Sequence, residues 1–312
     1  MKVLFVASAN RNGITSIVKS QGESLIRKNI ILDFYGIKGK GIRGYLSNVP
    51  LLKKHIIAFN PDIIHAHYSL SGIAAGLTGV NKPIVVSFMG SDTRSGYLQK
   101  KILHLFIRKN KWQKVIVKSR AMRNEIEYNE ARVIPNGVNL SCFKPVDGQK
   151  LKKKFNFSEE KRTILFLANP ERLEKNFHLA EEAYKLVNND TIELQVKYNL
   201  PSELIPEILN AADLILLTSK WEGSPNVVKE AMACNCPVVT TNVGDVEWLF
   251  GNEPGYYISS FDPKDVAEKI NMAIKFSKEY RKTRGRERLL ALELNSEAIA
   301  KRIIEIYHEI LL

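Results

Sequence analysis

The stretch from Asp213 to Thr241 reads DLILLTSKWEGSPNVVKEAMACNCPVVTT and contains the structural unit that repeats along the chain. The apolar run Leu214–Leu217 precedes a polar loop, a helical pattern over Asn226–Cys234 and a second apolar run at Pro237–Thr241. Short apolar runs without polar alternation are typical of strands buried on both faces of a parallel sheet. The stretch therefore predicts a strand, a crossover helix and a second strand parallel to the first.

The same alternation continues on both sides of this stretch. Eleven apolar runs are candidate strands: Lys2–Ala7, Ile30–Tyr35, Ile63–Ala66, Pro83–Phe88, Lys114–Val117, Ala131–Ile134, Thr163–Ala168, Thr191–Val196, Asp213–Leu217, Pro237–Thr241 and Gly255–Ile258. Amphipathic patterns between them predict helices: Thr15–Arg27, Tyr45–Phe59, Tyr97–Lys109, Phe177–Val187, Ser202–Ala211, Asn226–Cys234 and Pro263–Phe276. This order predicts the α/β class, with parallel sheets covered by helices on both faces.

The length of 312 residues suggests two domains at about 150 residues each. A turn signal at Pro135–Gly137 and a break near Pro145–Gly148 indicate the boundary. We expect one Rossmann-like domain over residues 1–146 and a second over residues 147–295, followed by a long amphipathic helix over residues 296–312. Ligands of such sheets bind where strands end and helices begin, so we expect the two domains to face a cleft.

The charge of the chain is unevenly distributed. It has 46 Lys and Arg against 33 Asp and Glu, a formal net charge of +13. Residues 1–147 hold 23 of the basic and 8 of the acidic residues, whereas residues 148–312 hold 23 and 25. The surplus of the first half indicates an anionic partner such as nucleic acid, a membrane surface or a phosphorylated ligand.

Composition also excludes several classes of protein. The N-terminal apolar run Val3–Ala7 is far shorter than the about 20 residues of a spanning helix, and shorter than the core of a signal peptide. Cys142, Cys234 and Cys236 are too few for a disulfide framework, and no Cys or His cluster beside them indicates a zinc site. We expect reduced thiols and a cytoplasmic protein.

The loop after the Asp213–Leu217 strand carries the first candidate site. Gly223 permits an unusual loop conformation, and Pro225 suits a first helical turn. Free backbone amides over Ser224–Val227, including Asn226, could hold phosphate or sugar oxygens. The carboxylates of Glu222 and Glu230 could accept hydrogen bonds from two sets of vicinal hydroxyls. The alternative interpretation is a solvated helix face with a capping Glu.

Two other strand ends carry cations or glycine. Gly13 lies in the loop after the first strand, beside Arg11, where a helix N-terminus attracts anions. Arg172 and Lys175 follow the Thr163–Ala168 strand, and cations there could neutralise a departing diphosphate. An ordinary turn in the first loop, and a salt-bridged helix start in the second, are the alternatives.

Histidine and aspartate end two adjacent strands of the first half. His67 follows the Ile63–Ala66 strand and Asp92 follows the Pro83–Phe88 strand. Both could face the expected cleft, although a single His at a strand end is more often structural. His65, which lies inside its strand, is interpreted as structural.

These segments together resemble the retaining GT-B glycosyltransferases of family four. The matching pieces are PDIIHAHY over Pro61–Tyr68, Gly90-Ser91-Asp92, IPNGVN over Ile134–Asn139, Glu171–Asn176, NAADLILL over Asn210–Leu217, EGSPNVVKEAMA over Glu222–Ala233 and PVVTTNVGD over Pro237–Asp245. The spacing of Glu222 and Glu230, with EAMA and PVV after them, is the most specific part of the resemblance.

The resemblance implies a role for each candidate. Glu230 would hold the ribose of the nucleotide, Glu222 would contact the donor sugar, and Lys175 would compensate the charge of the diphosphate. The amides of Ser224–Val227 would lie against the sugar and phosphates, and Gly13 would approach the diphosphate from the other domain. The remaining implied positions are His67 and Asp92 on the acceptor side and Tyr198 and Asn199 near the base. The last helix would cross back, so that the acceptor-side domain comprises residues 1–146 plus 296–312.

The sequence departs from the family pattern at two positions. Pro170 stands five residues before Lys175, where relatives usually carry Arg, and Arg172 is the candidate substitute. Met89 stands before the Gly-Ser-Asp triplet, where many relatives carry His. A non-catalytic relative is therefore one alternative, and a nucleotide-sugar epimerase or hydrolase of GT-B shape is another.

We expect a retaining, hexosyltransferase-type enzyme that moves a sugar from a nucleotide-diphosphate sugar to a glycan or lipid-linked acceptor in cell-surface polysaccharide or glycolipid assembly. Lys175, Arg172 and a helix dipole would stabilise the departing diphosphate. The sequence has no Asp-X-Asp motif, so we expect no divalent metal and no cofactor besides the donor substrate. It has no helix-turn-helix, zinc-finger or RNP-like motif, so we do not expect nucleic acid as a partner.

The cationic surplus is densest between Asp92 and Glu125, where no acid occurs. Ten cations lie there: Arg94, Lys100, Lys101, Arg108, Lys109, Lys111, Lys114, Lys118, Arg120 and Arg123. Apolar residues lie at helical spacing among them: Leu98, Ile102, Leu105 and Phe106. Either the apolar residues face the core and the cations are solvated, or the segment binds an anionic membrane, where each cation adds about 1 kcal/mol. The second interpretation predicts a peripheral protein on the cytoplasmic face of the membrane.

Overall fold

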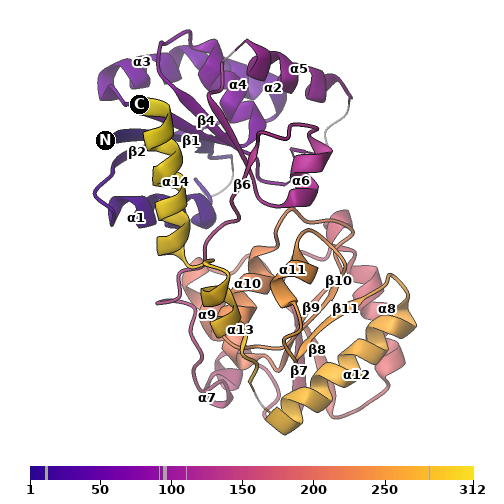
Figure 1. The fold of residues 1–312 in the computed structure, drawn as a ribbon. Helices are drawn as coiled ribbons and strands as arrows, with labels where there is room; N and C mark the ends of the chain where they lie inside the picture. Colours follow the sequence, from indigo (N-terminus) through magenta and orange to yellow (C-terminus); the bar gives the residue numbers. More distant parts are fainter. Residues whose placement is uncertain (11–12, 91, 94–96, 110, 281) are drawn as a thin grey trace. The chain divides into compact units, whose positions relative to one another are not determined.

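The computed structural model describes residues 1–10, 13–90, 92–93, 97–109, 111–280 and 282–312. These residues form two compact units, which Figure 1 shows in ribbon form. The first unit consists of Met1–Gly137 and Ser296–Leu312, and the second consists of Val138–Asn295. Each unit has its own parallel sheet and its own core, as the alternation in the sequence predicts.

The first unit is built on a six-stranded sheet in which all neighbouring strands are parallel. In spatial order its strands are β2 (Ile31–Ile37), β1 (Lys2–Ser8), β3 (Ile63–His67), β4 (Ile84–Ser87), β5 (Lys114–Val117) and β6 (Arg132–Val133). The order of the strands changes direction between β1 and β3. A ligand of such a sheet binds at this switch point, outside the carboxyl ends of the strands.

Seven helices of the described residues cover this sheet: α1 (Ser16–Ile26), α2 (Gly41–Ser47), α3 (Val49–Phe59), α4 (Ser69–Leu77), α5 (Tyr97–Arg108), α6 (Arg120–Glu125) and α14 (Ser296–Leu311). On one face, Leu4 and Val6 of β1 pack in a core that contains Leu52 of α3 and Ala74 of α4. Helices α1 and α14 pack against each other, and Figure 1 shows them side by side.

A buried polar contact anchors α14 to the centre of the sheet. The Tyr307 hydroxyl lies 2.5 Å from Nδ1 of His65, whose Nε2 lies 2.8 Å from the Ser87 hydroxyl. Burial and the charge of Lys118 lower the pKa of His65 to about 3, so the ring is neutral and offers one donor and one acceptor. The expectation that His65 is structural and that the last helix belongs to the first domain agrees with this contact.

The second unit is built on a five-stranded parallel sheet. In spatial order its strands are β11 (Tyr256–Ser259), β10 (Val238–Thr241), β9 (Leu214–Leu217), β7 (Arg162–Phe166) and β8 (Ile192–Val196). The order changes direction between β7 and β9, which makes the switch point of this sheet. All four residues of β9 are 3% exposed or less, as expected for a strand covered on both faces.

Helical segments of the second unit cover both faces of its sheet. They are α7 (Gln149–Lys152), η1 (Lys153–Phe155), η2 (Leu173–Lys175), α8 (Phe177–Val187), η3 (Ser202–Leu204), α9 (Ile205–Ala211), α10 (Asn226–Ala233), α11 (Val246–Phe250), α12 (Pro263–Tyr280) and α13 (Gly285–Ala291). Leu179 of α8 and Ile270 of α12 share one core with Ile164 of β7. Helices α9 and α13 pack on α10.

The unit boundary lies nine residues before the expected one, between Gly137 and Val138 rather than between residues 146 and 147. The segment after Gly137 is held by the second unit through backbone groups. The Arg286 guanidinium donates to the carbonyls of Leu140 and Phe143 at 2.9 and 2.7 Å, and the Asn210 side chain bonds the backbone of Lys144 and Val146. The pattern of apolar runs does not predict these contacts, because the segment is neither strand nor helix.

The basic segment before Glu125 divides into different environments. Lys101, Arg108, Lys109 and Lys111 are exposed, whereas Lys118 is 2% exposed and lies beside the buried histidines. Leu105 is 48% exposed, and Phe106 packs on Trp112 at the edge of the core. Arg94 and the side chains of Leu98, Lys100 and Ile102 lie outside the described residues. Among the described helices, none is long and apolar enough to cross a bilayer.

Replacing Tyr307 with Phe tests the anchor of α14. The change leaves Nδ1 of buried His65 without its partner, so we expect unfolding to become easier by about 1–3 kcal/mol. Chemical denaturation monitored by circular dichroism measures the change. Tyr280→Phe is the matched control, because Tyr280 is 61% exposed and its hydroxyl contributes little to stability. Equal stability of both variants would contradict the anchor.

Candidate functional site

The switch point of the second sheet brings Lys175 and Glu222 together. Lys175 ends η2, in the loop after β7, and Glu222 lies in the loop after β9. Lys175 Nζ lies 2.5 Å from Oε1 of Glu222, and both side chains are largely buried. The Ser219 hydroxyl donates to the same oxygen at 2.8 Å. Glu222 therefore retains Oε2 as an acceptor for a further hydrogen bond.

Backbone contacts hold these two loops together. The Lys220 amide donates to the carbonyl of Glu174 at 2.8 Å, and the Thr218 hydroxyl donates to the carbonyls of Lys175 and Asn176. The Thr241 hydroxyl, at the end of β10, donates to the carbonyl of Ser219 at 2.6 Å. The ion pair is thus supported from three neighbouring strands of the sheet.

Arg172 is not part of this ion pair. Its guanidinium pairs with Glu174, with Nε 2.7 Å from Oε1, and its side chain is 47% exposed. The salt-bridged loop that the sequence offered as an alternative is present at this residue. The predicted action of Arg172 on a diphosphate stays a prediction.

The residues of the predicted amide cradle open helix α10. Ser224 and Pro225 are buried, Pro225 caps the helix in an extended conformation, and Asn226 and Val227 form the first turn. The first amides of a helix have no acceptor within the helix, and they attract anions. Pro225 has no N–H, so it shapes the cradle and donates no hydrogen bond, which corrects its inclusion among the amide donors. Gly223 is buried beside this turn.

Glu230 lies about one turn into α10, with its side chain half-buried. Burial raises the pKa of its carboxyl to about 7, and the ammonium of Lys229 opposes this effect. Because this raised pKa is about 7, against an ordinary value of 4.5, the Glu230 carboxyl is partly protonated at neutral pH. The carboxyl therefore accepts hydroxyl hydrogen bonds best above pH 7.

Tyr198 and Asn199 follow β8 at the same edge of the sheet. Tyr198 is 46% exposed, and Asn199 has a φ of 55°, the left-handed conformation that Asn tolerates. An exposed ring beside the switch point suits stacking on a base. Its predicted contact with the nucleotide stays a prediction.

The first unit places its candidates around its own switch point. Gly13 follows β1 and His67 ends β3, the two strands between which the order changes. Gly13 has a φ of 91°, which only glycine adopts readily, and nothing lies within 4 Å of where a Cβ would stand. Glycine is therefore required there by backbone conformation, not by crowding within the chain.

His67 and Asp92 are both buried, at 2% exposure. The His67 ring stacks on His65 with centroids 4.5 Å apart, and neither ring nitrogen has a hydrogen-bond partner among the described residues. Burial, His65 and Lys118 lower the pKa of His67 well below its ordinary value, so its ring is neutral.

Asp92 fastens the loops after β3 and β4. Its carboxylate accepts the backbone amides of Ser69 at 2.9 Å, Met89 at 2.9 Å and Gly90 at 3.0 Å. Burial raises the pKa of Asp92 to about 6 against these three hydrogen bonds. Asp92 thus has a structural task at the expected acceptor side, and its contact with an acceptor stays a prediction.

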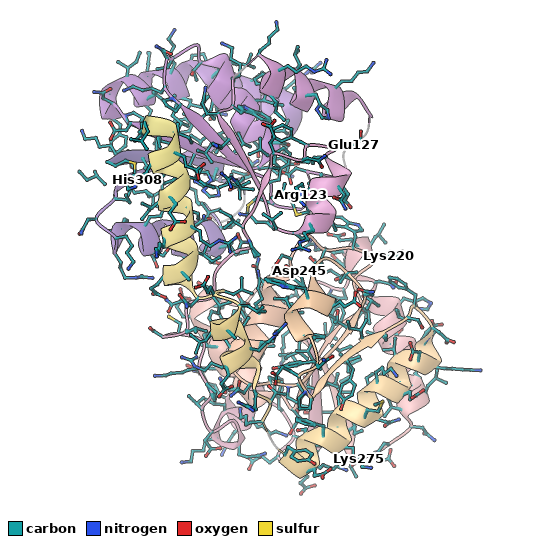
Figure 2. All side chains as sticks on the ribbon, in the orientation of Figure 1. Arg123, Glu127, Lys220, Asp245, Lys275 and His308 are labelled. Carbon is teal, nitrogen blue, oxygen red and sulfur yellow. The ribbon has the colours of Figure 1, made fainter. Side chains whose placement is uncertain are left out.

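Three further residues near this site were not predicted as site residues from the sequence: Lys229, Ser219 and Asp245. Lys229 is fully buried and donates to the Ser224 hydroxyl at 3.0 Å. The loop of Asp245 follows β10, and Figure 2 shows Asp245 and Lys220 at the same end of the second unit, away from Lys275. A signal for Lys229 was present, because a lysine interrupts the apolar positions Val228, Ala231 and Met232 of α10.

A separate polar cavity of about 750 Å³ lies in the first unit. Its lining includes Arg120 and Arg123 of α6, Arg132 of β6 and Arg302 and Glu305 of α14. None of the predicted site residues is in this lining. The candidate site is therefore defined by the strand ends and not by this cavity.

Two Rossmann-like parallel-sheet units with polar loops at their switch points define an α/β architecture of the GT-B type. The family model described as glycosyl transferases group 1 matches residues 191–289, and the model described as glycosyltransferase family 4 matches residues 18–141. The chain belongs to the group 1 glycosyltransferases.

Individual relatives agree with this assignment. TuaC of Bacillus subtilis, whose name refers to a teichuronic acid biosynthesis glycosyltransferase, is 28% identical over 235 residues, 67% of this chain and 60% of that protein. An Escherichia coli UDP-Gal:alpha-D-GlcNAc-diphosphoundecaprenol alpha-1,3-galactosyltransferase is 26% identical over 285 residues, 76% of this chain and 70% of that protein. The sucrose-phosphate synthase structure from Thermosynechococcus elongatus superposes with a TM-score of 0.83 at 16% identity, over 99% of both chains, and supports the fold alone.

The raised pKa of Glu230 predicts that binding of a nucleotide sugar strengthens with pH. Hydroxyl groups donate to the ionised carboxylate, so affinity should be about tenfold weaker at pH 6 than at pH 8. The charged group that acts on Glu230 is Lys229 on α10, which in turn interacts with Asp245 after β10. Glu230 also acts on the neighbouring Cys234, together with Lys282 and with Arg286 of α13.

Titration calorimetry with a nucleotide sugar measures this dependence. A free nucleoside diphosphate would confuse the result, because its terminal phosphate itself titrates at about pH 6. Glu230→Gln removes the titrating group and should give weaker binding that is independent of pH in this range. A wild-type affinity that does not change between pH 6 and pH 8 would contradict the prediction.

Proposed function

We propose that this glycosyltransferase is a retaining enzyme that moves a hexose from a nucleoside-diphosphate sugar to a glycan or lipid-linked acceptor. The observation that carries the proposal is the Lys175–Glu222 ion pair at the switch point of the second sheet, beside the N-terminus of α10. A cation, free amides and a carboxylate acceptor are the groups that a sugar diphosphate requires.

Each residue of the second unit has one task in this proposal. Lys175 and the first amides of α10 balance the charge that grows on the diphosphate as the anomeric C–O bond breaks. Glu222 accepts hydrogen bonds from sugar hydroxyls through Oε2, and Glu230 accepts them from the ribose. Arg172 assists at the diphosphate after release from Glu174, and Tyr198 and Asn199 contact the base.

Donor binding exchanges partners of the ion pair. In the unliganded chain Lys175 and Glu222 satisfy each other, so neither charge is buried alone. The diphosphate attracts Lys175, while the sugar hydroxyls occupy Glu222. The pair therefore holds both side chains near their bound positions before the donor arrives, which reduces the ordering cost of binding.

The acceptor hydroxyl forms its bond on the face of the sugar that the diphosphate leaves, and its proton passes to the departing diphosphate. On the first unit, His67 and Asp92 serve the acceptor side, Asp92 by holding the loops after β3 and β4, and the Gly13 loop is our candidate for a contact with the diphosphate. Cations and amides supply the charge stabilisation, so we propose that no divalent metal is needed.

The names of two relatives support the substrate class. TuaC is named for teichuronic acid biosynthesis, and the Escherichia coli relative uses UDP-Gal and a diphosphoundecaprenol-linked acceptor. These names favour a UDP-sugar donor and an acceptor in cell-surface polysaccharide or glycolipid assembly. We therefore propose that the enzyme works at the cytoplasmic face of a membrane.

The experiment measures release of nucleoside diphosphate from UDP-galactose and other nucleotide sugars, with and without a GlcNAc-diphospholipid acceptor. We expect a hit in a thermal-shift screen, acceptor-dependent turnover unaffected by EDTA, and a product whose anomeric configuration matches that of the donor by NMR. Rapid donor conversion without any acceptor would instead indicate an epimerase or hydrolase.

Variants of the ion pair sharpen this test. Glu222→Gln and Lys175→Ala should each lower turnover by about 100-fold or more, because each removes charge complementarity at the reacting group. Lys185→Ala is the control, since Lys185 is a surface lysine of α8 with 69% of its side chain exposed. Wild-type turnover in both ion-pair variants would contradict the assignments.

We further propose that the first unit binds an anionic membrane through the basic end of α5 and the loop after it. The exposed cations there are Lys101, Arg108, Lys109 and Lys111, and Leu105 exposes apolar surface among them. Exposed apolar side chains among cations are typical of a peripheral membrane surface.

Co-sedimentation with anionic vesicles at low salt tests this surface. Replacing Lys101, Arg108 and Lys109 together with Glu should weaken binding by about 100-fold or more, since each cation contributes about 1 kcal/mol. A control with Glu at Lys150, Lys264 and Lys278 changes the net charge equally in the second unit. Equal binding by both triple variants would contradict a specific membrane surface.

A further inference from the structure

Lys229 is a buried cation that the proposed reaction does not use. It lies in α10 with 0% exposure, one position before Glu230. Removal of an ammonium group from water is costly unless hydrogen bonds and opposite charges compensate it. The surroundings of Lys229 therefore show what its charge stabilises.

The ammonium of Lys229 contacts the turn that begins α10. Its Nζ donates to the Ser224 hydroxyl at 3.0 Å, and Ser224 is itself only 8% exposed. Ser224 stands within the proposed amide cradle, directly after Gly223. The long Lys229 side chain thus connects the body of the helix to the loop that receives the donor.

Two carboxylates surround this contact from different elements. Burial lowers the pKa of Lys229 to about 8. The charges of Asp245, after β10, and of Glu230 oppose this effect and favour the charged form. The Lys229 charge and the Ser224 hydroxyl in turn oppose the effect of burial, which raises the pKa of Asp245. Lys229 is therefore the common partner of Ser224, Asp245 and Glu230.

The loop of Asp245 also touches the cradle through its backbone. Gly244 has a φ of 63°, and a Cβ placed on it would lie 2.9 Å from the Gly223 carbonyl oxygen. The two loops pack so closely that a shift of one would displace the other. The charged residues beside Ser224 therefore lie where the packing of these two loops determines the position of the Gly223 peptide.

We propose that Lys229 is a positioning residue for the donor, which holds Ser224 and its neighbouring amides in the conformation that receives the diphosphate and keeps Glu230 ionised for the ribose. The inference deepens the proposed function and rests on it. An apolar side chain of similar length would remove the hydrogen bond to Ser224 and the positive charge that compensates the buried Asp245 carboxylate.

Lys229→Met tests the proposal, because it keeps the side chain unbranched and nearly as long and removes the charge. We expect a folded protein that binds a nucleotide sugar at least tenfold more weakly at pH 7.5. The midpoint of the pH dependence of binding should move to higher pH, because the Lys229 ammonium no longer opposes protonation of Glu230. Lys229→Arg, which keeps the charge, should restore part of the affinity and the original midpoint.

Lys185→Met is the matched control, a loss of one lysine charge from an exposed site of the same unit. If Lys229→Met does not fold, Ser224→Ala replaces it, because this change removes the lysine's contact by deleting one oxygen atom. We expect Ser224→Ala to bind about threefold to tenfold more weakly, and binding equal to wild type would overturn the proposal.

A purely structural lysine gives a different result. A folded Lys229→Met variant with wild-type affinity and an unchanged midpoint, whatever its thermal stability, would overturn the positioning role. Failure of the proposed function is distinguishable, since the wild-type protein would then bind no nucleotide sugar in the same titration.

Discussion

The constraint on which this structure depends is that parallel strands end at one edge of their sheet. Every crossover helix begins there, so polar loops far apart in the sequence converge where the strand order reverses. In the second sheet the reversal lies between β7 and β9, and the loops of these strands carry Lys175 and Glu222. In the first sheet it lies between β1 and β3, which are followed by Gly13 and His67. The chemistry of each unit follows from the order of its strands.

Burial strengthens the electrostatic interactions of charged groups at this edge of the sheet. An exposed ion pair contributes little, but the Lys175–Glu222 pair is largely buried and supported by Ser219. In this largely buried site, a dianionic ligand can replace one residue of the ion pair only if it supplies an equivalent charge. In the proposed donor complex, the pair would therefore favour a phosphate group beside a hydroxyl-bearing group over a neutral ligand.

Much of the fold was predictable from sequence because every strand is a compact apolar run, and all eleven predicted strands are present in the described residues within two positions. The predicted helix Tyr45–Phe59 was wrong as a single element, since Pro50 interrupts helical bonding and the Asn48 side chain donates to the Gly44 carbonyl at the break. Lys118 was expected on a basic surface and is buried beside His65 and His67. Periodicity identifies which face of a helix is apolar, but it does not show which charges the fold encloses.

The net charge of each half is consequently a poor guide to where anions bind. Residues 148–312 carry two more acids than bases, yet the candidate site for a sugar diphosphate lies there. The groups there that can attract a diphosphate are few and local, namely Lys175 and the first amides of α10, while the buried Lys229 donates to Ser224 of the same turn. Acids such as Glu181 and Glu268 lie on its exposed helices, where water screens them. The surplus cations of the first half are mostly exposed and suit a broad anionic surface, whereas the few buried cations of the second unit suit one defined ligand.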